Sequence, residues 1–488
     1  MGNPGLQGDF TRRGDSMRHL IIGNGPAGVM AAEMIRKHAP CDPIVLLGNE
    51  PGPSYSRTLL PRMVSGDASE AACYLRKESD HFYKLRIEQR FARVSRIDAR
   101  ARMAVTEEGA TFGYDRLLIA TGARARIPKI PGIHSPGVRA CWTLQDARKL
   151  VELAQPNAQV IVIGAGLVGC VLLESLIMRR VRLVVIEQAA HMASSMMKAG
   201  AARMLKRWCE SKEIQVRTST SVTAIDNIGR TSRGPHLAAR LSNGERLAAD
   251  LIIYATGAQP DLSFLQGSGI DCARGILVNP SMQTNLPGIY AAGDCAEAFD
   301  VETGRMMIAG VLPNALDQAC CAALNMVGKS ACQQRIRRIS MLSTMGLVAT
   351  SLGEWRGLPG GQWVEASDER SYKHLRLEFR KDVLIGANAI GLRDYVGMLR
   401  DLIQHQVGLG EWKDRLLRDP TRLKEAYRAC VLRHGCMDDG LATRDVTRAA
   451  SPGAMRGSAS SETIAAIAYR TIANAARRSP PTPSGNPL

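Results

Sequence analysis

The fold is decided by the stretch Arg18-His19-Leu20-Ile21-Ile22-Gly23-Asn24-Gly25-Pro26-Ala27-Gly28. Its apolar opening predicts a short β-strand, and a helical pattern follows the glycines to about Lys37. In such a loop the first glycine allows a tight turn, and the second lets the backbone approach a pyrophosphate. The third lets the helix pack closely on the strand. A buried strand at 44–47 and the acid Glu50 come next, so the stretch predicts a dinucleotide-binding unit.

The same pattern recurs downstream. A strand at 160–163 enters a second glycine loop at 164–169, a helix follows, and the strand at 183–186 ends at Glu187. The last element of each copy is an apolar strand followed by Ala-Thr-Gly. This tripeptide stands at 120–122 in the first copy and at 255–257 in the second. The two acids follow their glycine loops at about the 20-residue spacing of a ribose-binding carboxylate. The chain therefore predicts two related α/β units, each with its own nucleotide.

The amino-acid composition excludes several classes of protein. In 488 residues, 63 Lys and Arg face 46 Asp and Glu, which gives a net charge of +17. This excess favours either an acidic partner or a basic proteome background, while the lack of arginine-rich runs argues against nucleic acid. The sequence contains no run of about 18 apolar residues, so no membrane-spanning helix is predicted. The twelve cysteines are scattered without zinc-ligand spacing, which predicts reduced thiols, a cytoplasmic location and no metal site.

A third motif separates the two nucleotide sites. The stretch 284–294 runs from a strand into the turn Gly293-Asp294. With this motif in place, residues 17–400 resemble the pyridine nucleotide–disulfide oxidoreductase superfamily, flavoproteins with two dinucleotide-binding domains. The resemblance implies that the first glycine loop holds FAD, that the second holds NAD(P), and that Asp294 contacts the ribityl chain of FAD.

The resemblance also implies a set of contacts for each nucleotide. For FAD these are Gly23, Gly25, Pro26, Ala27, Gly28, Glu50, Arg57, Ala120, Thr121, Gly122, Gly293 and Asp294. For NAD they are Gly164, Gly166, Leu167, Val168, Gly169, Glu187 and Gly257. Asn49 stands where an acid is usual, so the FAD ribose contact is expected at Glu50. Residues 188–191 after Glu187 offer no Arg or Lys for a 2′-phosphate, so NADH is expected rather than NADPH.

The predicted class is α/β, with two Rossmann-like domains and a C-terminal α+β domain. The FAD domain comprises 17–134 and 270–330, and the NAD domain at 140–268 is inserted into it. The C-terminal domain at 335–436 has strand patterns at 374–379 and 383–387 and helical patterns near 394–407 and 411–433. In the family this domain packs against the flavin domain and mediates dimers or docking, which leaves a homodimer open. Residues 1–16 and 437–488 are expected to be disordered except for a weak helix at 462–478, and Met17 is a candidate start.

The sequence lacks the residues with which disulfide reductases of the superfamily act on their substrate. Disulfide reductases of the superfamily carry a Cys-x4-Cys pair soon after the FAD ribose acid and a C-terminal His-Pro-Thr. Residues 51–62 contain no cysteine, and no His-Pro-Thr exists in the chain. Cys41 precedes the second strand and Cys73 comes too late, so neither is expected to carry a redox cycle. The stretch Tyr55-Ser56-Arg57-x-Leu-Leu instead resembles the rubredoxin and flavorubredoxin reductases and the FAD/NAD portion of the nitrite reductase large subunit.

We therefore expect an FAD-dependent NADH:acceptor oxidoreductase. Hydride passes from NADH to FAD, and electrons pass to an acidic iron–sulfur, rubredoxin-type or nitrite reductase partner. The hydride step needs no acid–base residue, and Tyr55 and Arg57 are candidates for the flavin edge, with a solvent-facing loop as the alternative. Two other functions stay open: a flavin NADH oxidase or quinone reductase, and a non-enzymatic NADH-binding subunit.

Overall fold

The computed structural model describes residues 16–231, 234–300, 304–333 and 336–432. The segments expected to be disordered, 1–16 except Ser16 and 437–488 with its weak helix at 462–478, lie outside the described residues. The chain divides into two compact units. Among the described residues, the first unit comprises 16–55, 75–123 and 260–336, and the second comprises 56–74, 124–259 and 337–432.

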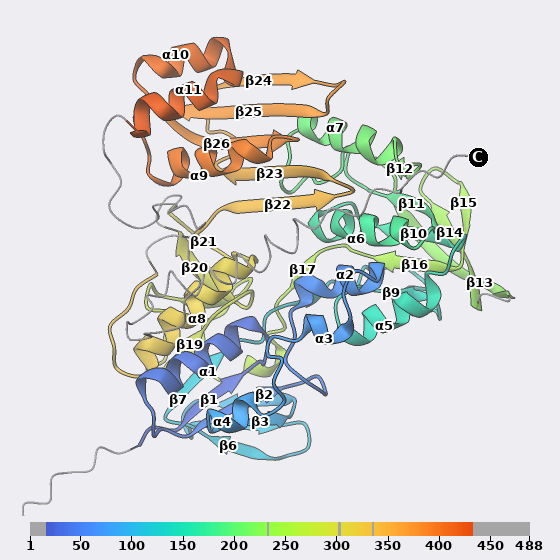
Figure 1. Ribbon diagram of the computed structural model, residues 1–488. Helices are drawn as coiled ribbons and strands as arrows, with labels where there is room; N and C mark the ends of the chain where they lie inside the picture. Colours follow the sequence, from blue (N-terminus) through green and yellow to red (C-terminus); the bar gives the residue numbers. More distant parts are fainter. Residues whose placement is uncertain (1–15, 232–233, 301–303, 334–335, 433–488) are drawn as a thin grey trace, which may run out of the picture. The chain divides into compact units, whose positions relative to one another are not determined.

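A five-stranded parallel sheet forms the centre of the first unit. Its strands, in spatial order, are β19 (Ile289–Ala291), β7 (Arg116–Ile119), β1 (His19–Ile22), β2 (Ile44–Gly48) and β3 (Ile87–Phe91). Apart from the half-buried Val45, the apolar residues of β1, β2 and β7 are buried, as expected of parallel strands that are covered on both faces. The helices α1 (Pro26–His38) and α8 (Leu312–Met326) pack side by side (Figure 1).

Two smaller sheets complete the first unit. One contains β4 (Val94–Asp98), β5 (Met103–Thr106) and β6 (Thr111–Gly113), and the other contains β18 (Ile276–Val278), β20 (Ala296–Asp300) and β21 (Arg305–Met307).

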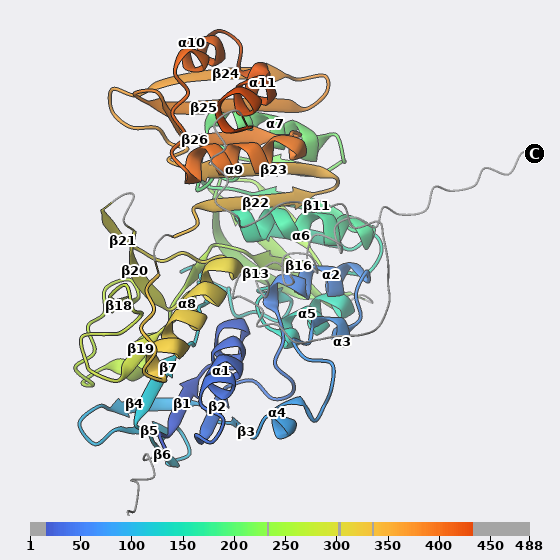
Figure 2. The same cartoon turned by 60° about the vertical axis from the view of Figure 1, so that its left-hand side comes forward.

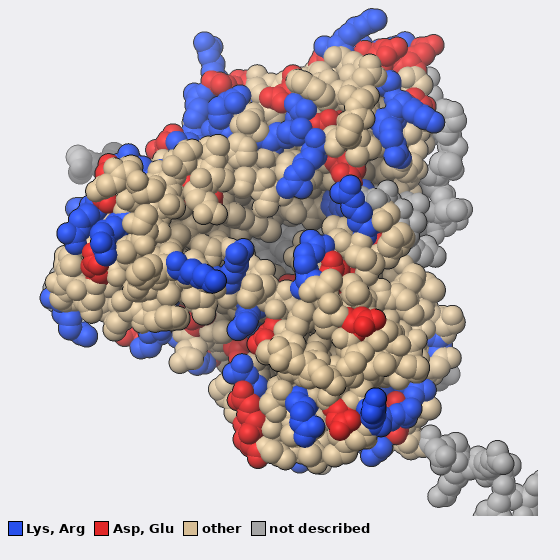
Figure 3. Space-filling model, turned by 180° about the vertical axis from the view of Figure 1, so that it is seen from behind, with Lys and Arg blue, Asp and Glu red and all other residues tan. Residues whose placement is uncertain are grey.

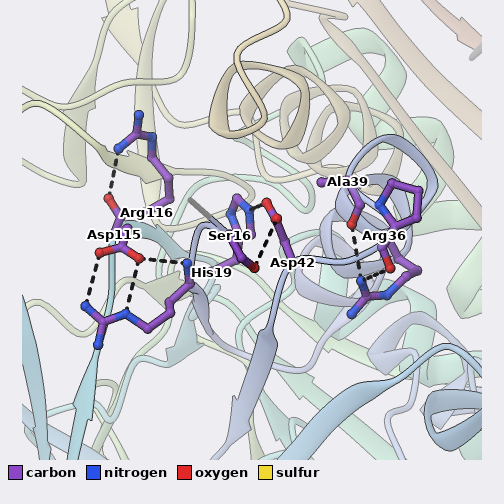
Figure 4. A network of polar contacts seen from close by, with 9 residues as sticks. Ser16, His19, Arg36, Ala39, Asp42, Asp115 and Arg116 are labelled. Carbon is purple, nitrogen blue, oxygen red and sulfur yellow. Dashed lines mark hydrogen bonds and ion pairs between the residues drawn. The ribbon is translucent and has the colours of Figure 1, made fainter. Parts of the chain in front are cut away.

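A polar network holds the amino-terminal edge of the main sheet (Figure 4). The guanidinium of Arg18 donates to both oxygens of Asp115 at 3.1 Å, and its backbone N–H donates to the same carboxylate at 2.8 Å. These hydrogen bonds from Arg18 lower the pKa of Asp115 to about 2. The buried His19 has its Nε2 2.9 Å from Asp42 Oδ2, and burial nevertheless lowers the pKa of this histidine. This edge is opposite the carboxyl ends of the strands, where ligands bind in open α/β sheets.

The second unit is built on a second parallel sheet. Its strands, in spatial order, are β12 (Gln215–Arg217), β11 (Arg182–Ile186), β10 (Gln159–Ile163), β16 (Leu251–Tyr254) and β9 (Val138–Arg139). Helices α5 (Leu144–Leu153), α6 (Leu167–Met178) and α7 (Ala199–Glu210) belong to the same unit. The series β1–α1–β2 recurs as β10–α6–β11, which confirms the predicted repeat of two α/β units.

Three further elements surround this second parallel sheet. The segment 56–74 carries α2 (Leu60–Ser65) and α3 (Glu70–Cys73), and α2 packs against α5 and α6. A short antiparallel pair joins β8 (Arg124–Ala125) to β17 (Ala258–Gln259). An antiparallel three-stranded sheet contains β13 (Val222–Thr231), β14 (Gly234–Leu241) and β15 (Arg246–Ala249).

The C-terminal part of the second unit is an antiparallel sheet. Its strands, in spatial order, are β22 (Ile339–Thr344), β23 (Leu347–Gly353), β26 (Val383–Ile390), β25 (Lys373–Arg380) and β24 (Gln362–Asp368), which confirms the strands expected at 374–379 and 383–387. The sheet contacts α6 through β22 and α7 through β25 and β26. The first expected helix is α9 (Val396–Gln404).

The second helical stretch of this part, expected over 411–433, is divided. It contains α10 (Glu411–Arg418) and α11 (Leu423–Tyr427), separated by a turn at Asp419-Pro420. Proline has no backbone N–H and disfavours a helical residue before it, which explains the division. No helix in the described part of the chain is both long enough and apolar enough to cross a membrane.

Candidate functional site

The first glycine loop joins β1 to α1 at the carboxyl edge of the first sheet. Gly23 has φ +112°, and a Cβ there would lie 2.1 Å from the carbonyl oxygen of Ala120. A Cβ on Gly28 would lie 1.8 Å from the carbonyl oxygen of Gly23, so this close packing of helix on loop requires glycine. A Cβ on Gly25 would meet no atom within 4 Å. The loop is therefore open at Gly25, beside the first amides of α1, where a phosphate can be received.

The second glycine loop, between β10 and α6, repeats this geometry. Gly164 has φ +100°, and a Cβ there would lie 2.6 Å from the carbonyl oxygen of Ala255. A Cβ on Gly169 would lie 2.1 Å from the carbonyl oxygen of Gly164, and one on Gly166 would meet nothing within 4 Å. Between the second and third glycines of each motif lie the first helix residues, which are Pro26 and Ala27 in α1 and Leu167 and Val168 in α6. Both units therefore contain the same loop geometry, one that can receive a pyrophosphate.

The Ala-Thr-Gly segments follow β7 and β16, and the alanine of each lies against the first glycine of one of the two loops. Each ends in a glycine with positive φ, +66° at Gly122 and +103° at Gly257. A Cβ at either position would meet no atom within 4 Å, so the space beside both glycines is open. Thr121 precedes the first of them, and the hydroxyl of Thr256 before the second donates to the carbonyl oxygen of Arg126 at 2.7 Å.

Glu187 follows β11 and is bonded directly to the second glycine loop. Its Oε2 accepts a hydrogen bond from the amide of Ala165, and its Oε1 accepts one from the amide of Ala189, both at 2.7 Å. Each carboxylate oxygen has a second lone pair, which can accept from a ribose hydroxyl. The amide of Glu187 donates to the carbonyl oxygen of Arg217 at 2.8 Å, and the side chain of Arg217 is exposed. Arg217 was not predictable from the local sequence, because pairing of β11 with β12 brings it to this position.

Glu50 follows β2 in the first unit and has a partner close in sequence. The hydroxyl of Tyr55 donates to Glu50 Oε2 at 2.6 Å, and Tyr55 is buried. A tyrosine that was expected at the flavin edge is therefore bonded to the expected ribose acid. This bond restricts the orientation of the carboxylate.

Gly293 lies where two helices begin. A Cβ there would lie 3.4 Å from the Cβ of Ala27 in α1 and 3.7 Å from the Cβ of Ala315 in α8. Its own N–H donates to Gln318 Oε1 at 2.8 Å. The carboxyl end of β19 and the first turns of α1 and α8 therefore meet at one place in the first unit.

The start of α8 supplies polar groups to the same place. The carboxylate of Asp294 lies 3.6 Å from the position that a Cβ of Gly310 would take, just before the helix. Asn314 is fully buried, and the buried Nε2 of Gln318 has no hydrogen-bond partner within the described residues. An orphaned donor beside an open glycine loop fits a bound dinucleotide with polar groups. Asn314 and Gln318 were not among the predicted site residues, although two polar residues one turn apart in an apolar helix were a usable signal.

Comparison with known proteins adds to this geometry. Residues 17–319 match the family model described as "Pyridine nucleotide-disulphide oxidoreductase". The chain belongs to this family. Its members are FAD-dependent NAD(P)H oxidoreductases, so binding of FAD and NAD(P)H is typical of the family.

Two relatives and one structure describe the chain's place in the family. It is 30 % identical over 408 residues to the NADH-dependent phenylglyoxylate dehydrogenase subunit epsilon of Aromatoleum evansii, and the match covers 83 % of this chain and 95 % of the relative. It is also 30 % identical to the rubredoxin-NAD(+) reductase of Pseudomonas putida, over 64 % of this chain and 81 % of that protein. The fold matches the reductase in the covalent putidaredoxin reductase–putidaredoxin complex with a TM-score of 0.76 and 22 % identity, over 85 % of this chain and 99 % of that chain.

The chain differs from the disulfide-reducing members of the family in its cysteines. Residues 51–62 contain no thiol, Cys41 is exposed before β2, and Cys73 is buried in α3. Burial raises the pKa of Cys141 to about 12, so that thiol is not a ready nucleophile. No group of three metal-ligating side chains lies close enough to bind an ion among the residues that the structure describes.

Arg57, expected to contact FAD, lies over an aromatic ring in the second unit. Its guanidinium carbon is 5.6 Å from the ring centre of Trp142, within the range of a cation–π interaction. The sequence analysis did not single out Trp142, because the contact joins residues that are far apart in the chain.

One face of the molecule shows how its basic side chains are distributed. On the face in Figure 3, Lys and Arg side chains are scattered with Asp and Glu between them. A continuous basic stripe, the usual electrostatic footprint for a nucleic acid, is not seen on that face.

Proposed function

We propose that this chain is an FAD-dependent NADH:acceptor oxidoreductase that passes electrons to an iron–sulfur or rubredoxin-type centre on another polypeptide. The observation that carries the proposal is the segment after Glu50, where disulfide reductases have their cysteine pair. This chain has Tyr55 there, and its hydroxyl is bonded to Glu50. Without a thiol in this segment, electrons have no cysteine route and leave for an external acceptor.

The residues of the first unit would hold FAD. The open loop at Gly25 and the first amides of α1 receive the pyrophosphate, and Glu50 accepts from the ribose. Asp294 and Gln318 would supply polar contacts to the rest of the dinucleotide. When bound, FAD supplies two-electron chemistry with a nicotinamide and one-electron chemistry with an iron–sulfur acceptor. The amino-terminal end of α8 places a partial positive charge beside Gly293, which favours negative charge developing nearby.

The residues of the second unit would hold NADH. The loop at 164–169 receives the pyrophosphate, and Glu187 accepts from the ribose hydroxyls of the adenosine. A 2′-phosphate would place negative charge against this carboxylate, so NADH is preferred over NADPH.

The acceptor is proposed to be an acidic protein. The net charge of +17 is spread over the chain, and iron–sulfur and rubredoxin-type carriers are usually acidic. Opposite charge speeds the encounter of two such proteins and makes it sensitive to salt. The A. evansii relative is named as a dehydrogenase subunit and the P. putida relative is named for rubredoxin, which supports a partner polypeptide.

We also propose a cytoplasmic location. The described cysteines are free, and among them Cys41, Cys272 and Cys332 are exposed, which suits a reducing compartment.

Steady-state turnover with a set of acceptors tests the proposal. The FAD-loaded protein is given NADH with a [2Fe–2S] ferredoxin, a rubredoxin, a soluble quinone or oxygen alone, each at low and high ionic strength. We expect turnover with at least one of the two protein carriers, weakening as salt is raised. Fast turnover with quinone or oxygen alone, and none with either carrier, would favour the oxidase or quinone reductase. NADH binding without any flavin reduction would favour the non-enzymatic subunit.

A further inference from the structure

Asn388 is a fully buried polar side chain in the middle of β26. Its neighbours Ala387 and Ala389 pack with Leu399 and Leu402 of α9. Successive residues of a strand point to opposite faces, so Asn388 points away from α9 and toward α7, which contacts β26 on the other face (Figure 2).

The amide of Asn388 binds the segment that leads into α7. Its Oδ1 accepts a hydrogen bond from the backbone N–H of Lys198 at 2.9 Å, and its Nδ2 donates to the carbonyl oxygen of Met196 at 3.0 Å. Lys198 is the N-cap residue of α7. Both bonds are therefore made to backbone groups that the helix itself does not satisfy. A side chain of the C-terminal sheet thus fixes the start of a helix in the nucleotide-binding part of the unit.

The same segment is bonded to the second glycine loop. The amides of Met196 and Met197 donate to the carbonyl oxygen of Ala193 at 2.9 and 2.8 Å, and the amide of Ala193 donates to the carbonyl oxygen of Ala165 at 2.7 Å. Ala193 is fully buried and has φ +50°, an uncommon conformation for a residue with a side chain. The backbone amide of the same residue, Ala165, donates to the carboxylate of Glu187. A chain of hydrogen bonds therefore runs from the side chain of Asn388 through the backbone of Met196, Ala193 and Ala165 to the carboxylate of Glu187.

We infer that Asn388 is a positioning residue for nucleotide binding in the second unit. It holds the turn at 193–197, which in turn holds Ala165 and the loop in the shape that receives a pyrophosphate. The inference rests on the proposed function, because it takes the loop at 164–169 as the NADH site. It adds a role for the C-terminal sheet, which helps to form a nucleotide site without touching the nucleotide.

A second set of contacts keeps α7 in register with the sheet. A Cβ on Gly200 would lie 2.3 Å from Glu365 Oε1 and 2.9 Å from His374 Cε1, so the first turn of α7 is seated closely on β24 and β25. Arg376 in turn donates to Glu365 Oε2 at 2.9 Å and to Glu378 Oε1 at 2.7 Å. The helix cannot slide along the sheet without breaking these contacts, so the position of the sheet is transmitted to Lys198.

Two substitutions test these hydrogen bonds: one removes both of them, and the other removes only the bond from the N–H of Lys198. Asn388→Ala deletes the side chain. Lys198→Pro deletes only the N–H that Asn388 accepts from, and the φ of −73° at Lys198 suits proline. Lys198→Ala is the matched control, since it keeps the N–H and loses only the side chain. Leu402→Ala is the control for domain stability, since it weakens the C-terminal core from the α9 face.

The measurement is stopped-flow reduction of the bound flavin over a series of NADH concentrations, with FAD content determined for each variant. For Asn388→Ala and Lys198→Pro we expect the Kd for NADH to rise about 3- to 30-fold while the limiting rate stays within about two-fold. Lys198→Ala and Leu402→Ala should bind NADH as the wild type does, even where Leu402→Ala lowers the Tm.

The outcomes separate the inference from the proposed function. Wild-type NADH affinity in Lys198→Pro with full FAD content overturns the inference, whether or not Asn388→Ala folds. A raised Kd in Leu402→Ala equal to that in Asn388→Ala also overturns it, because general destabilisation then explains the effect. A wild-type protein whose flavin NADH does not reduce contradicts the proposed function itself.

Discussion

Oε2 of Glu187 and the backbone amide of Ala165 are joined by a 2.7 Å hydrogen bond. The acid that is expected to bind the adenosine ribose therefore also shapes the loop that is expected to bind the pyrophosphate. Removal of this carboxylate should affect both parts of the nucleotide at once.

Glu187→Ala should raise the KM for NADH by about ten-fold or more, because a hydrogen bond to a charged group contributes roughly 1.5–3 kcal/mol. It should also improve the use of NADPH relative to NADH, because the repulsion is gone and the exposed Arg217 remains beside the site. Flavin reduction by each nucleotide, in Glu187→Ala and in a double variant with Arg217→Ala, measures both effects. A wild-type protein that reacts better with NADPH refutes the assignment, and an unchanged preference in Glu187→Ala removes the proposed role of its charge.

Tyr55→Phe should weaken FAD binding by about ten-fold, because Glu50 loses the hydroxyl that donates to it at 2.6 Å. Tyr74→Phe is the matched control, since it removes another tyrosine–glutamate bond, the one to Glu70 at 2.9 Å on α3. Titration of the apoprotein with FAD compares the two variants. Equal loss of affinity in both, or no loss in Tyr55→Phe, contradicts the role of Tyr55 in orienting the acid.

Replacement of Cys41 and Cys73 by Ser should leave electron transfer from NADH to an artificial acceptor within about a few-fold of wild type. Cys41 is exposed before β2 and Cys73 is buried in α3, and neither lies in the segment 51–62. Steady-state rates and the spectrum after two-electron reduction provide the check. A charge-transfer band from thiolate to flavin that disappears in either variant would show that a cysteine belongs to the redox site.

His19 should make the protein less stable below about pH 6.5. Burial lowers its pKa in the folded state, so as the pH falls the unfolded chain takes up a proton first and is favoured. The free energy of unfolding should then fall by at most about 1.4 kcal/mol per pH unit until the pH reaches the folded-state pKa.

The Tm between pH 7.5 and 5 measures this dependence. His19→Gln should flatten it in part, since burial also lowers the pKa of His374. The exposed His405 provides the control His405→Gln, which should leave the slope unchanged. An unchanged slope in His19→Gln would show that His19 is not the group that titrates.

The glycine loops were predictable because their chemistry is local. Gly23, Gly28, Gly164 and Gly169 leave no room for a Cβ, so the motif is visible in a short stretch of sequence. The contact of Asn388 with Lys198 was not predictable, because it depends on how a distant sheet is seated on α7. Hydrophobic alternation predicts that β26 is a strand, but it cannot say which backbone group a buried amide will reach.

The central claim is that electrons from NADH pass through the bound flavin to a separate protein. Anaerobic stopped-flow of the FAD-loaded protein with NADH and an excess of an oxidised [2Fe–2S] ferredoxin or a rubredoxin tests it most directly. We expect fast bleaching of the flavin absorbance, followed by reduction of at least one carrier, with two carriers reduced per NADH. Flavin that stays oxidised with NADH, or that is bleached while neither carrier is reduced and recovers only when oxygen or quinone is admitted, would contradict the claim.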